Sequence, residues 1–534
     1  DAALPARLER RSGDIPARPV SFVTRKAATA TRVHLSDMLG IPRLYDVDRL
    51  DLTVTTTLDA RVQQAVTEAL RALKKPDAVA AEGLRGYHLL EGGEDPSKVI
   101  YSFTLFERGR DANLLRVQTD NFDEPFDINR GAKLDLGSTA KLRTVVTYLE
   151  IITELHRRYG GLDTDELDEV KTNPRDHLSR WALDFLADHP GADLPALLDA
   201  ALERRYSASP GEAFFTGGGL HTFHNFKKED DGKILSVRQA FHDSVNLVFV
   251  RLMRDMVRYY MYAQAPEDGD PDERRQEYLV RFADREGSEF LQRFYQKYRG
   301  KTPEQAEELL LAGVRPTPRR LAAVYRTLAP EADRKAFADF LRRRLPPEKV
   351  SEAKFDRLYE ELAPDRMSLA DRGYTARVHP LELWLVGFLR QHPGATLKQV
   401  LEAGRDERQE AYAWLFRTRH KHAQERRIQN VREEDAFRAI YRSWKRQGYP
   451  FDSLVPSYAT ALGSSADRPS ALAELMGIVV NNGMRLPTVR IEKLHFAAGT
   501  PYETVLEQRR KAGERVLAPE VAAAVRGLLV GVVE

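Results

Sequence analysis

The chain has 534 residues, and its 82 basic and 80 acidic side chains nearly cancel to a formal net charge of +2. A chain this long is expected to form several domains, and the charge balance, without a basic stripe interleaved with aromatic residues, does not fit a nucleic-acid-binding protein. The absence of cysteine excludes disulfides, thiolate metal sites and a cysteine nucleophile. No stretch approaches the roughly 20 apolar residues of a membrane span.

The first part of the chain changes character near residue 49. Residues 1–48 are rich in Arg and Pro with weak periodicity, which predicts a linker or an irregular pedestal. "LDLTVTTTLD" then alternates apolar and polar residues, many of them β-branched, which predicts a strand. Asp59 is placed to cap the helix "ARVQQAVTEALRAL". "KVIYSFTLFER" and "NLLRVQTDNF" predict two strands joined by the turn "GRDAN".

The next segment, "LDLGSTAKLRTVVTYLEII" (residues 134–152), contains a Ser-x-x-Lys pair at a predicted helix start. Ser138 and Lys141 are three residues apart, so they lie on the same side of the first helical turn. Two interpretations stay open from these residues alone. Ser138 is either a nucleophile with Lys141 as its base, or a capping serine beside a solvated lysine.

A second Ser-x-x-Lys sequence, Ser351 to Lys354, is expected to be structural. It lies in "SEAKFDRLYEELA", whose apolar residues recur at the spacing of one buried face on a highly charged helix. No second motif follows it. We therefore predict that Ser351 and Lys354 have no catalytic role.

Charged helices and a Gly-rich loop, "TGGGLHTFHNF", lead to a Ser-x-Asn sequence about a hundred residues after Ser138. Ser244 and Asn246 precede a long apolar helix, "LVFVRLMRDM". A hydroxyl and an amide two residues apart in such a turn can face one cleft. The alternative is that Ser244 caps the helix and Asn246 lies in its first turn.

The composition changes again in residues 255–450, where Arg and Glu dominate and apolar residues recur at helical spacing, for example Phe437, Ile440, Tyr441 and Trp444. We expect an all-helical insertion with a small core of its own. From residue 451 to 534, strand, turn and helix signals mix again. The predicted architecture is an α/β (α+β) core, in parts 49–254 and 451–534, interrupted by this insertion.

The order of the motifs resembles one family. Ser-x-x-Lys in "LGSTAK" followed by Ser-x-Asn is the order found in penicillin-binding proteins and serine β-lactamases. Four segments are similar to the transpeptidase domain of class A penicillin-binding proteins: "LDLTVTTTLDARVQQAV", "DINRGAKLDLGSTAKLR", "HNFKKEDDGKILSVRQAFHDSVN" and "ALGSSADRPSALAELMGIVVNNGMRLP". The resemblance covers residues 48–255 and 455–534. It implies a core with an antiparallel sheet flanked by helices.

The resemblance also implies an activity, that of a peptidoglycan D,D-transpeptidase working through a serine acyl-enzyme. Ser138 would attack a D-Ala-D-Ala stem peptide, Lys141 would take its proton, Ser244 would relay protons to the leaving group, and Asn246 would bind the substrate amide. β-Lactams would acylate Ser138 as substrate mimics. No metal or cofactor is required, and His221 and His224 are interpreted as polar loop residues.

Two family features are absent from residues 1–534: the third motif, Lys-Ser/Thr-Gly, and the acidic motifs of a companion glycosyltransferase domain. We expect a chain truncated before the third motif, with any glycosyltransferase domain and membrane anchor outside it. The expected location is the cell envelope, on the periplasmic side of the inner membrane. Cell-wall synthesis factors are possible partners of the insertion. The alternatives are a catalytically silent scaffold in the cell envelope and a D,D-carboxypeptidase or β-lactamase-like hydrolase.

Overall fold

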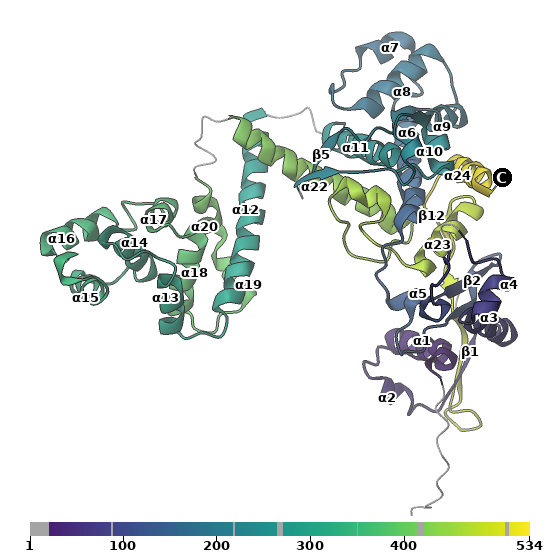
Figure 1. Ribbon diagram of the computed structural model, residues 1–534, viewed down its shortest axis with the longest axis horizontal. Helices are drawn as coiled ribbons and strands as arrows, with labels where there is room; N and C mark the ends of the chain where they lie inside the picture. Colours follow the sequence, from purple (N-terminus) through teal and green to yellow (C-terminus); the bar gives the residue numbers. More distant parts are fainter. Residues whose placement is uncertain are drawn as a thin grey trace, which may run out of the picture. The chain divides into compact units, whose positions relative to one another are not determined.

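The computed structural model describes residues 21–86, 89–216, 219–263, 271–349, 351–413, 421–507 and 512–533. The chain divides into two units, one formed by residues 1–263 with 436–534 and the other by residues 264–435. The first unit mixes helices with small, mostly antiparallel sheets, and the described elements of the second are all helical. The predicted fold class, an α/β core with a helical insertion, is confirmed (Figure 1).

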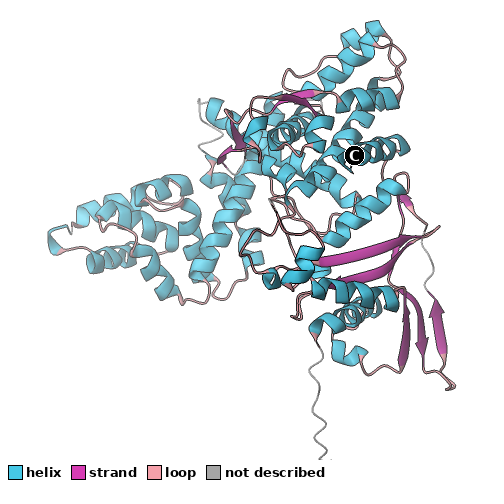
Figure 2. Cartoon of the chain, turned by 45° about the vertical axis from the view of Figure 1, so that its right-hand side comes forward, coloured by secondary structure: helices cyan, strands magenta, loops and turns pink. Residues whose placement is uncertain are grey.

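Two three-stranded sheets lie in the first unit, and Figure 2 shows them as separate groups of strands. One has the order β1-β10-β11 and the other the order β2-β3-β9, in which only β3 and β9 are parallel. The two-stranded pairs are β4-β7, β5-β6 and β8-β12, so the expected single sheet is divided. The early elements are α1 (Phe22–Leu39), α2 (Leu44–Val47), β1 (Leu52–Thr56), α3 (Ala60–Ala72), α4 (Pro76–Ala81), β2 (Ser102–Arg108) and β3 (Asn113–Asp120).

Several of these early elements follow the sequence prediction. Strands β2 and β3 pair antiparallel with Arg108 opposite Asn113, as the turn signal between them indicated. The Asp59 side chain accepts a hydrogen bond from the Val62 amide at 3.0 Å and caps α3. Helix α1 differs, because residues 22–39 were expected in a linker or irregular pedestal. Lys26 holds it by a buried ion pair of 2.5 Å with Asp120 of β3.

The main core of the first unit is built around helices α6 and α11, which pack on each other (Figure 1). Twelve of the twenty residues of α6 are buried, so this helix is enclosed on most sides. The elements from residue 128 onward are α5 (Ile128–Gly131), the 3-10 turn η2 (Gly137–Thr139), α6 (Ala140–Tyr159), α7 (Thr164–Glu169), α8 (His177–Asp188), α9 (Leu194–Leu202), β4 (Arg205–Ser207), β5 (Ala213–Thr216), β6 (Gly219–Thr222), β7 (Ile234–Ser236), α10 (Val237–His242) and α11 (Asn246–Tyr262).

The C-terminal part of the first unit packs on the same core. Helix α24 contacts α6, α9, α10 and α23. The elements are the 3-10 turn η5 (Tyr458–Leu462), α23 (Pro469–Val480), β8 (Met484–Arg485), β9 (Thr488–Val489), β10 (Ile491–Phe496), β11 (Thr504–Glu507), β12 (Glu514–Arg515) and α24 (Pro519–Val533).

The second unit has its own hydrophobic core, in which α12, α14 and α18 make the central contacts. Its helices are α12 (Pro271–Tyr298), α13 (Pro303–Leu311), α14 (Pro318–Leu328), α15 (Arg334–Arg344), α16 (Glu352–Glu361), α17 (Leu369–Ala376), α18 (Pro380–Gln391), α19 (Leu397–Ala403), α20 (Arg405–Ala411) and the first part of α22 (Lys421–Arg446).

One prediction about the insertion is wrong. Phe437, Ile440 and Trp444 are buried in the core of the first unit, with Tyr441 packed against it, and do not belong to a core of the insertion. Helix α22 continues without a break past residue 435, where the contacts divide the two units. The apolar residues in the first part of α22 therefore belong to the core of the second unit, and those after residue 435 belong to the core of the first unit. Helical periodicity does not show to which core an apolar residue belongs.

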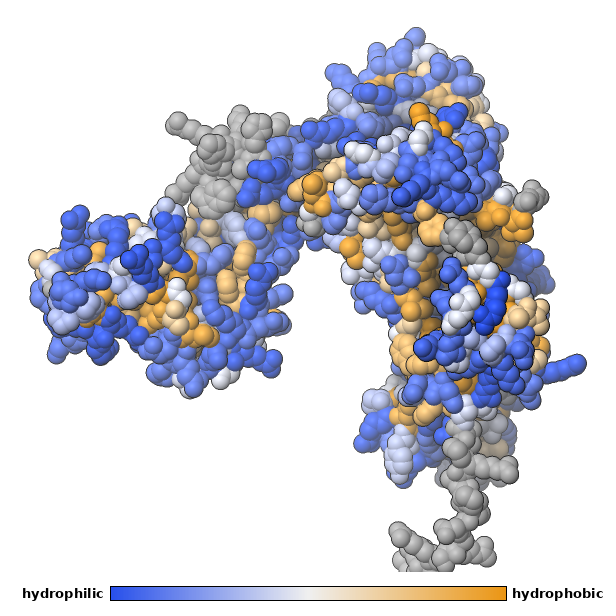
Figure 3. Space-filling model, in the orientation of Figure 1, coloured by the Kyte–Doolittle hydropathy of each residue, from blue (hydrophilic) through white to orange (hydrophobic). Residues whose placement is uncertain are grey.

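The surface is largely polar. Hydrophilic residues cover most of the face drawn in Figure 3, in keeping with the 30% of residues that are charged. Within the described ranges, no helix combines the length and the apolar composition needed to cross a membrane.

Candidate active site

The candidate nucleophile, Ser138, lies in the tight turn η2 immediately before α6. Gly137 adopts a positive φ of 56°, and its amide donates a hydrogen bond of 3.1 Å to the Asp135 side chain. The cap position of α6 is taken by Thr139, and no side chain makes a capping bond there. Ser138 is exposed, and its hydroxyl lies 3.1 Å from the amine of Lys141. The structure therefore does not use Ser138 as a helix cap.

Lys141 occupies the first turn of α6 and is 2% exposed. Its Nζ lies 3.1 Å from Ser138 Oγ, 3.0 Å from Ser244 Oγ and 2.6 Å from the Ser244 carbonyl oxygen. A fourth acceptor, Asn246 Oδ1, is 2.8 Å away. No carboxylate of the described residues makes an ion pair with it. All four predicted site residues thus meet at one amine, from segments more than a hundred positions apart.

The surroundings of Lys141 change its protonation. Burial lowers the pKa of the Lys141 ammonium from 10.5 to about 8, because the charged form loses hydration that no anion replaces. The ring of Phe249, 5.7 Å from Nζ, forms part of the apolar surroundings. About a tenth of the lysine is therefore neutral at pH 7.

Ser244 is held in an unusual backbone conformation, with φ at 57°. It lies in the turn between α10 and α11, where its amide donates to the Phe241 carbonyl at 3.3 Å and the Val245 amide donates to the Ala240 carbonyl at 2.9 Å. A left-handed conformation is costly for a serine and commonly persists where it has a use. Here it directs both the carbonyl and the hydroxyl of Ser244 towards Lys141. Val245, and not Ser244, is the cap residue of α11.

Asn246 is the first residue of α11, and both ends of its amide are engaged. Its oxygen accepts from Lys141, and its Nδ2 donates to the His224 carbonyl at 3.1 Å. The neighbouring Asn225 side chain accepts from the Leu247 amide at 3.0 Å. These bonds attach the loop after β6 to the start of α11 and fix the orientation of the Asn246 amide.

The partners of Lys141 determine what its amine can do. The Ser244 carbonyl and the Asn246 amide oxygen only accept hydrogen bonds, so they take two of its N–H donors. In the neutral amine, the remaining position is a lone pair, and the groups left to face it are the hydroxyls of Ser138 and Ser244. This arrangement suits a general base that removes a proton from one serine and returns it through the other.

A third segment, the loop "GSS" at residues 463–465, packs directly against the turn that carries Ser138. Gly463 has a φ of 104°, and a Cβ built on it would lie 2.6 Å from Asp135 Oδ1 and 2.7 Å from the Gly137 amide nitrogen. Only glycine allows the two backbones to approach so closely. The adjacent residues Leu134 and Asp467 exchange backbone hydrogen bonds of 3.3 and 2.8 Å, which continue this contact.

Sequence reasoning missed the ion pair that anchors α6. Arg143, two residues after Lys141, is fully buried, and its Nε donates to Asp467 Oδ2 at 2.5 Å. Its Nη atoms donate to Asp467 Oδ1 and to the carbonyls of Gln447 and Ala471. Arg143 and Asp467 both lie in segments that resemble the family, but nothing in the sequence indicates that these two residues, 324 positions apart, form an ion pair.

Other candidates are not part of this arrangement. Ser351 and Lys354 are exposed at the start of α16, and Phe355 and Leu358 form its buried face, as the apolar spacing indicated. That this pair has no catalytic role stays a prediction. His221 and His224 belong to no group of three or more metal-ligating side chains anywhere in the described residues. His224 instead contributes its backbone carbonyl to the site.

Comparison with known proteins adds structural likenesses only. No family model and no curated protein matches the chain. Among solved structures, it is similar to penicillin-binding protein PonA1 from Mycobacterium tuberculosis at 12% identity, over 95% of this chain and 69% of that one, with a TM-score of 0.37. A penicillin G acyl-enzyme complex of penicillin-binding protein A from M. tuberculosis matches at 12% identity over 90% and 63% of the chains, with a TM-score of 0.32.

A third similar structure is the D,D-transpeptidase domain of a peptidoglycan glycosyltransferase from Eggerthella lenta, at 13% identity, over 90% of this chain and 66% of that one, with a TM-score of 0.31. These structures come from the family that the sequence motifs resemble.

Proposed function

We propose that the chain carries the active site of a penicillin-binding D,D-transpeptidase that forms a serine acyl-enzyme with D-Ala-D-Ala stem peptides. The observation that carries the proposal is the position of the buried, carboxylate-free amine of Lys141 between the hydroxyls of Ser138 and Ser244. A serine with a lysine base needs a low lysine pKa and a second hydroxyl for the leaving group. Both conditions are met within one hydrogen-bond network.

In the proposed acylation, Ser138 Oγ bonds to the carbonyl carbon of the penultimate D-Ala and gives its proton to Lys141 Nζ. The tetrahedral intermediate then breaks its bond to the nitrogen of the terminal D-Ala. That nitrogen takes a proton from Ser244 Oγ, which is reprotonated by Lys141 across 3.0 Å. Terminal D-Ala leaves as a neutral amine, and the stem remains as an ester on Ser138.

In the proposed second step, the amine of a neighbouring stem attacks this ester and passes a proton back through Ser244 and Lys141 to Ser138. Asn246 has one Nδ2 hydrogen that its bond to the His224 carbonyl does not use, and this hydrogen is proposed to bind a carbonyl of the substrate. A β-lactam would react by the first step alone, because opening its ring leaves the departing nitrogen tethered in the site.

The test is labelling by a fluorescent penicillin, applied to the protein as its cell produces it. We expect one labelled peptide, which contains Ser138, and complete loss of label in Ser138→Ala. Ser351→Ala is the matched control, because Ser351 also begins a Ser-x-x-Lys sequence and is also exposed, but has no second motif beside it. Label that survives Ser138→Ala, or label on Ser351, contradicts the assignment.

The same acyl-enzyme distinguishes a transpeptidase from a hydrolase. Incubation with a D-Ala-D-Ala peptide and an added amine acceptor is expected to give the cross-linked amide in preference to the free acid. Release of the acid alone would identify a carboxypeptidase or β-lactamase-like enzyme. A protein that takes up no penicillin would be the silent scaffold.

A further inference from the structure

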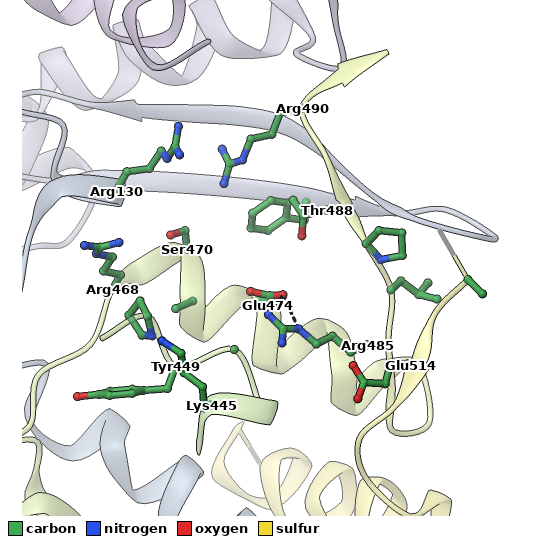
Figure 4. Close-up of a pocket in the computed structure, with 17 residues that line it drawn as sticks. Arg130, Lys445, Tyr449, Arg468, Ser470, Glu474, Arg485, Thr488, Arg490 and Glu514 are labelled. Atoms are coloured by element: carbon green, nitrogen blue, oxygen red, sulfur yellow. Dashed lines mark hydrogen bonds and ion pairs between the residues drawn. The ribbon is translucent and has the colours of Figure 1, made fainter. Parts of the chain in front are cut away.

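A cavity of about 830 Å³ lies in the first unit, and none of the four candidate site residues lines it. Its walls come from β2, α5, α23 and the segment from β8 to β12, together with the end of α22 and the residues that follow it (Figure 4). The cavity is therefore distinct from the proposed catalytic site, and its properties do not depend on the proposed function.

The lining is strongly cationic. Five basic side chains face two carboxylates, Glu474 and Glu514; the basic ones are Arg130, Lys445, Arg468, Arg485 and Arg490. This excess is local, because the whole chain has a formal net charge of only +2. An isolated concentration of positive charge in a cavity attracts and binds anions.

Two of the five cations already have acidic partners. Arg485 pairs with Glu474 at 2.9 Å, as the dashed line in Figure 4 marks. Lys445 lies 3.5 Å from Asp452 and donates to the Phe451 carbonyl at 3.0 Å. The charges of Arg485 and Lys445 are thus balanced by nearby carboxylates, and the other three basic residues of the cavity are arginines.

Arg130, Arg468 and Arg490 make no ion pair within 4.0 Å with any described carboxylate. Each donates to a single neutral acceptor: Arg130 to the Ala30 carbonyl at 3.2 Å, Arg468 to the Ala132 carbonyl at 3.3 Å, and Arg490 to Gln118 Oε1 at 2.8 Å. A guanidinium group has five N–H donors, so most of this donor capacity is not used by these bonds. Figure 4 shows Arg130 and Arg490 directed towards each other at one end of the cavity, with Arg468 next to Arg130.

This grouping is unfavourable without an anion. Burial, together with the positive charge of Arg130, lowers the pKa of Arg490 to about 10, and the carboxylates of Asp127 and Glu474 oppose this shift only in part. Arginine is normally protonated at any pH a protein experiences. Two half-buried guanidinium groups that repel each other cost stability in the free protein, as preorganised binding sites commonly do.

We propose that this cavity binds an organic phosphate, whose phosphate or diphosphate group is held by Arg130, Arg468 and Arg490. Three unpaired guanidinium groups match a group that carries two or three negative charges, whereas a carboxylate carries one. Guanidinium forks bind phosphate oxygens in pairs. The rest of the lining includes Phe106, Tyr449 and Leu486, which suit the organic part of such a ligand, and the volume exceeds that of the phosphate groups alone.

The test is calorimetric titration of the protein with inorganic pyrophosphate at low salt, with citrate as a non-phosphate trianion. We expect saturable binding of pyrophosphate and much weaker binding of citrate. The double variant Arg130→Gln with Arg490→Gln should lose pyrophosphate affinity by about tenfold or more, since it removes charge-assisted hydrogen bonds. The matched control is Arg61→Gln with Arg110→Gln, which removes the same charge from exposed positions outside the cavity and should bind as the parent does.

A stability measurement separates this role from a structural one. Without ligand, Arg130→Gln should melt at a higher temperature than the parent, because repulsion with Arg490 is relieved, and pyrophosphate should stabilise it less. If the double variant does not fold, Arg468→Gln must show the same loss of affinity. The proposal is overturned by an absence of saturable pyrophosphate binding, by citrate binding as tightly, or by equal losses in both double variants.

Discussion

Lys141 combines deep burial with an absence of nearby negative charge, and that combination determines its chemistry. Its hydrogen-bond partners are all neutral, so they satisfy the N–H donors without restoring the pKa that burial lowers. The Lys141 amine has a pKa of about 10.5 in the unfolded chain and of about 8 in the folded chain, so folding makes it lose its proton at a lower pH. Stability therefore rises with pH between these values, and the cost of burying the ammonium is fully present below pH 8.

The pKa of Lys141 gives a kinetic prediction. If its neutral amine is the base, the rate constant of penicillin acylation should rise about tenfold per pH unit below pH 8 and level off above it. Lys141→Arg keeps a positive charge that cannot be lost at these pH values, so acylation should fall by about a hundredfold or more. Stopped-flow acylation across the pH range measures both effects.

Circular dichroism of Lys141→Arg provides the control, because the variant should remain folded. Near-normal acylation by this variant, or a rate that does not depend on pH between 6 and 9, would mean that another group is the base.

The grouping of Ser138, Lys141, Ser244 and Asn246 could be predicted because the order of the two motifs and their flanking segments resembles that of penicillin-binding proteins. The spacing within each motif alone left a structural interpretation open. The roles of these four residues remain predictions, whereas the structure shows that the side chains of Ser138, Ser244 and Asn246 lie within hydrogen-bond distance of Lys141. The left-handed Ser244 and the close approach at Gly463 could not be foreseen, since both follow from contacts between distant segments. The positive φ of Ser244 has no local signal, because serine seldom adopts it.

At the scale of elements, α6 is positioned by its ion pair with the segment before α23. Asp467 neutralises the fully buried Arg143, and its backbone pairs with that of Leu134, close to the turn η2. The same residue thus fixes both the helix that carries Lys141 and the turn that carries Ser138. A pair of this kind specifies an arrangement strongly, because either partner alone would be a buried, uncompensated charge.

We predict that Asp467→Asn lowers the free energy of unfolding by about 3–5 kcal/mol, because it leaves the Arg143 guanidinium buried without an anion. Urea-induced unfolding measures this loss. Asp452→Asn is the matched control, since Asp452 is fully exposed beside Lys445 and should show no measurable change. Equal stability of the two variants would mean that the Arg143–Asp467 pair is not a structural requirement.

Other elements show where periodicity stops being informative. The helix α3 and the hairpin of β2 and β3 were predictable because a cap residue and a turn mark their ends. Helix α1 was missed because its basic residues and scattered apolar positions give a weak helical pattern. Its position depends on the ion pair between Lys26 and Asp120, which are about ninety positions apart in the sequence. The apolar face of α22 was recognised, but a helical stripe does not state which core it enters.

At the scale of the whole molecule, the two largest hydrophobic cores of the described residues share no member. One gathers residues from α6, α11, α24 and the end of α22, and the other gathers residues from α12 to α20 with the beginning of α22. Because each core is formed within one unit, we infer that the first unit folds without residues 264–435.

Replacing residues 264–435 by a flexible Gly-Ser linker should therefore leave a chain that melts cooperatively.

The matched control removes residues 255–450, the insertion boundaries expected from the sequence. That deletion also takes away Tyr259 and Trp444, both buried in the core of the first unit, and Phe437 and Ile440 with them. Removing several large buried side chains costs more than the whole stability of a typical domain. We expect the control to unfold while the shorter deletion remains folded, as judged by circular dichroism and thermal melting. Loss of cooperative melting in both would mean that the first unit requires the helical unit to fold.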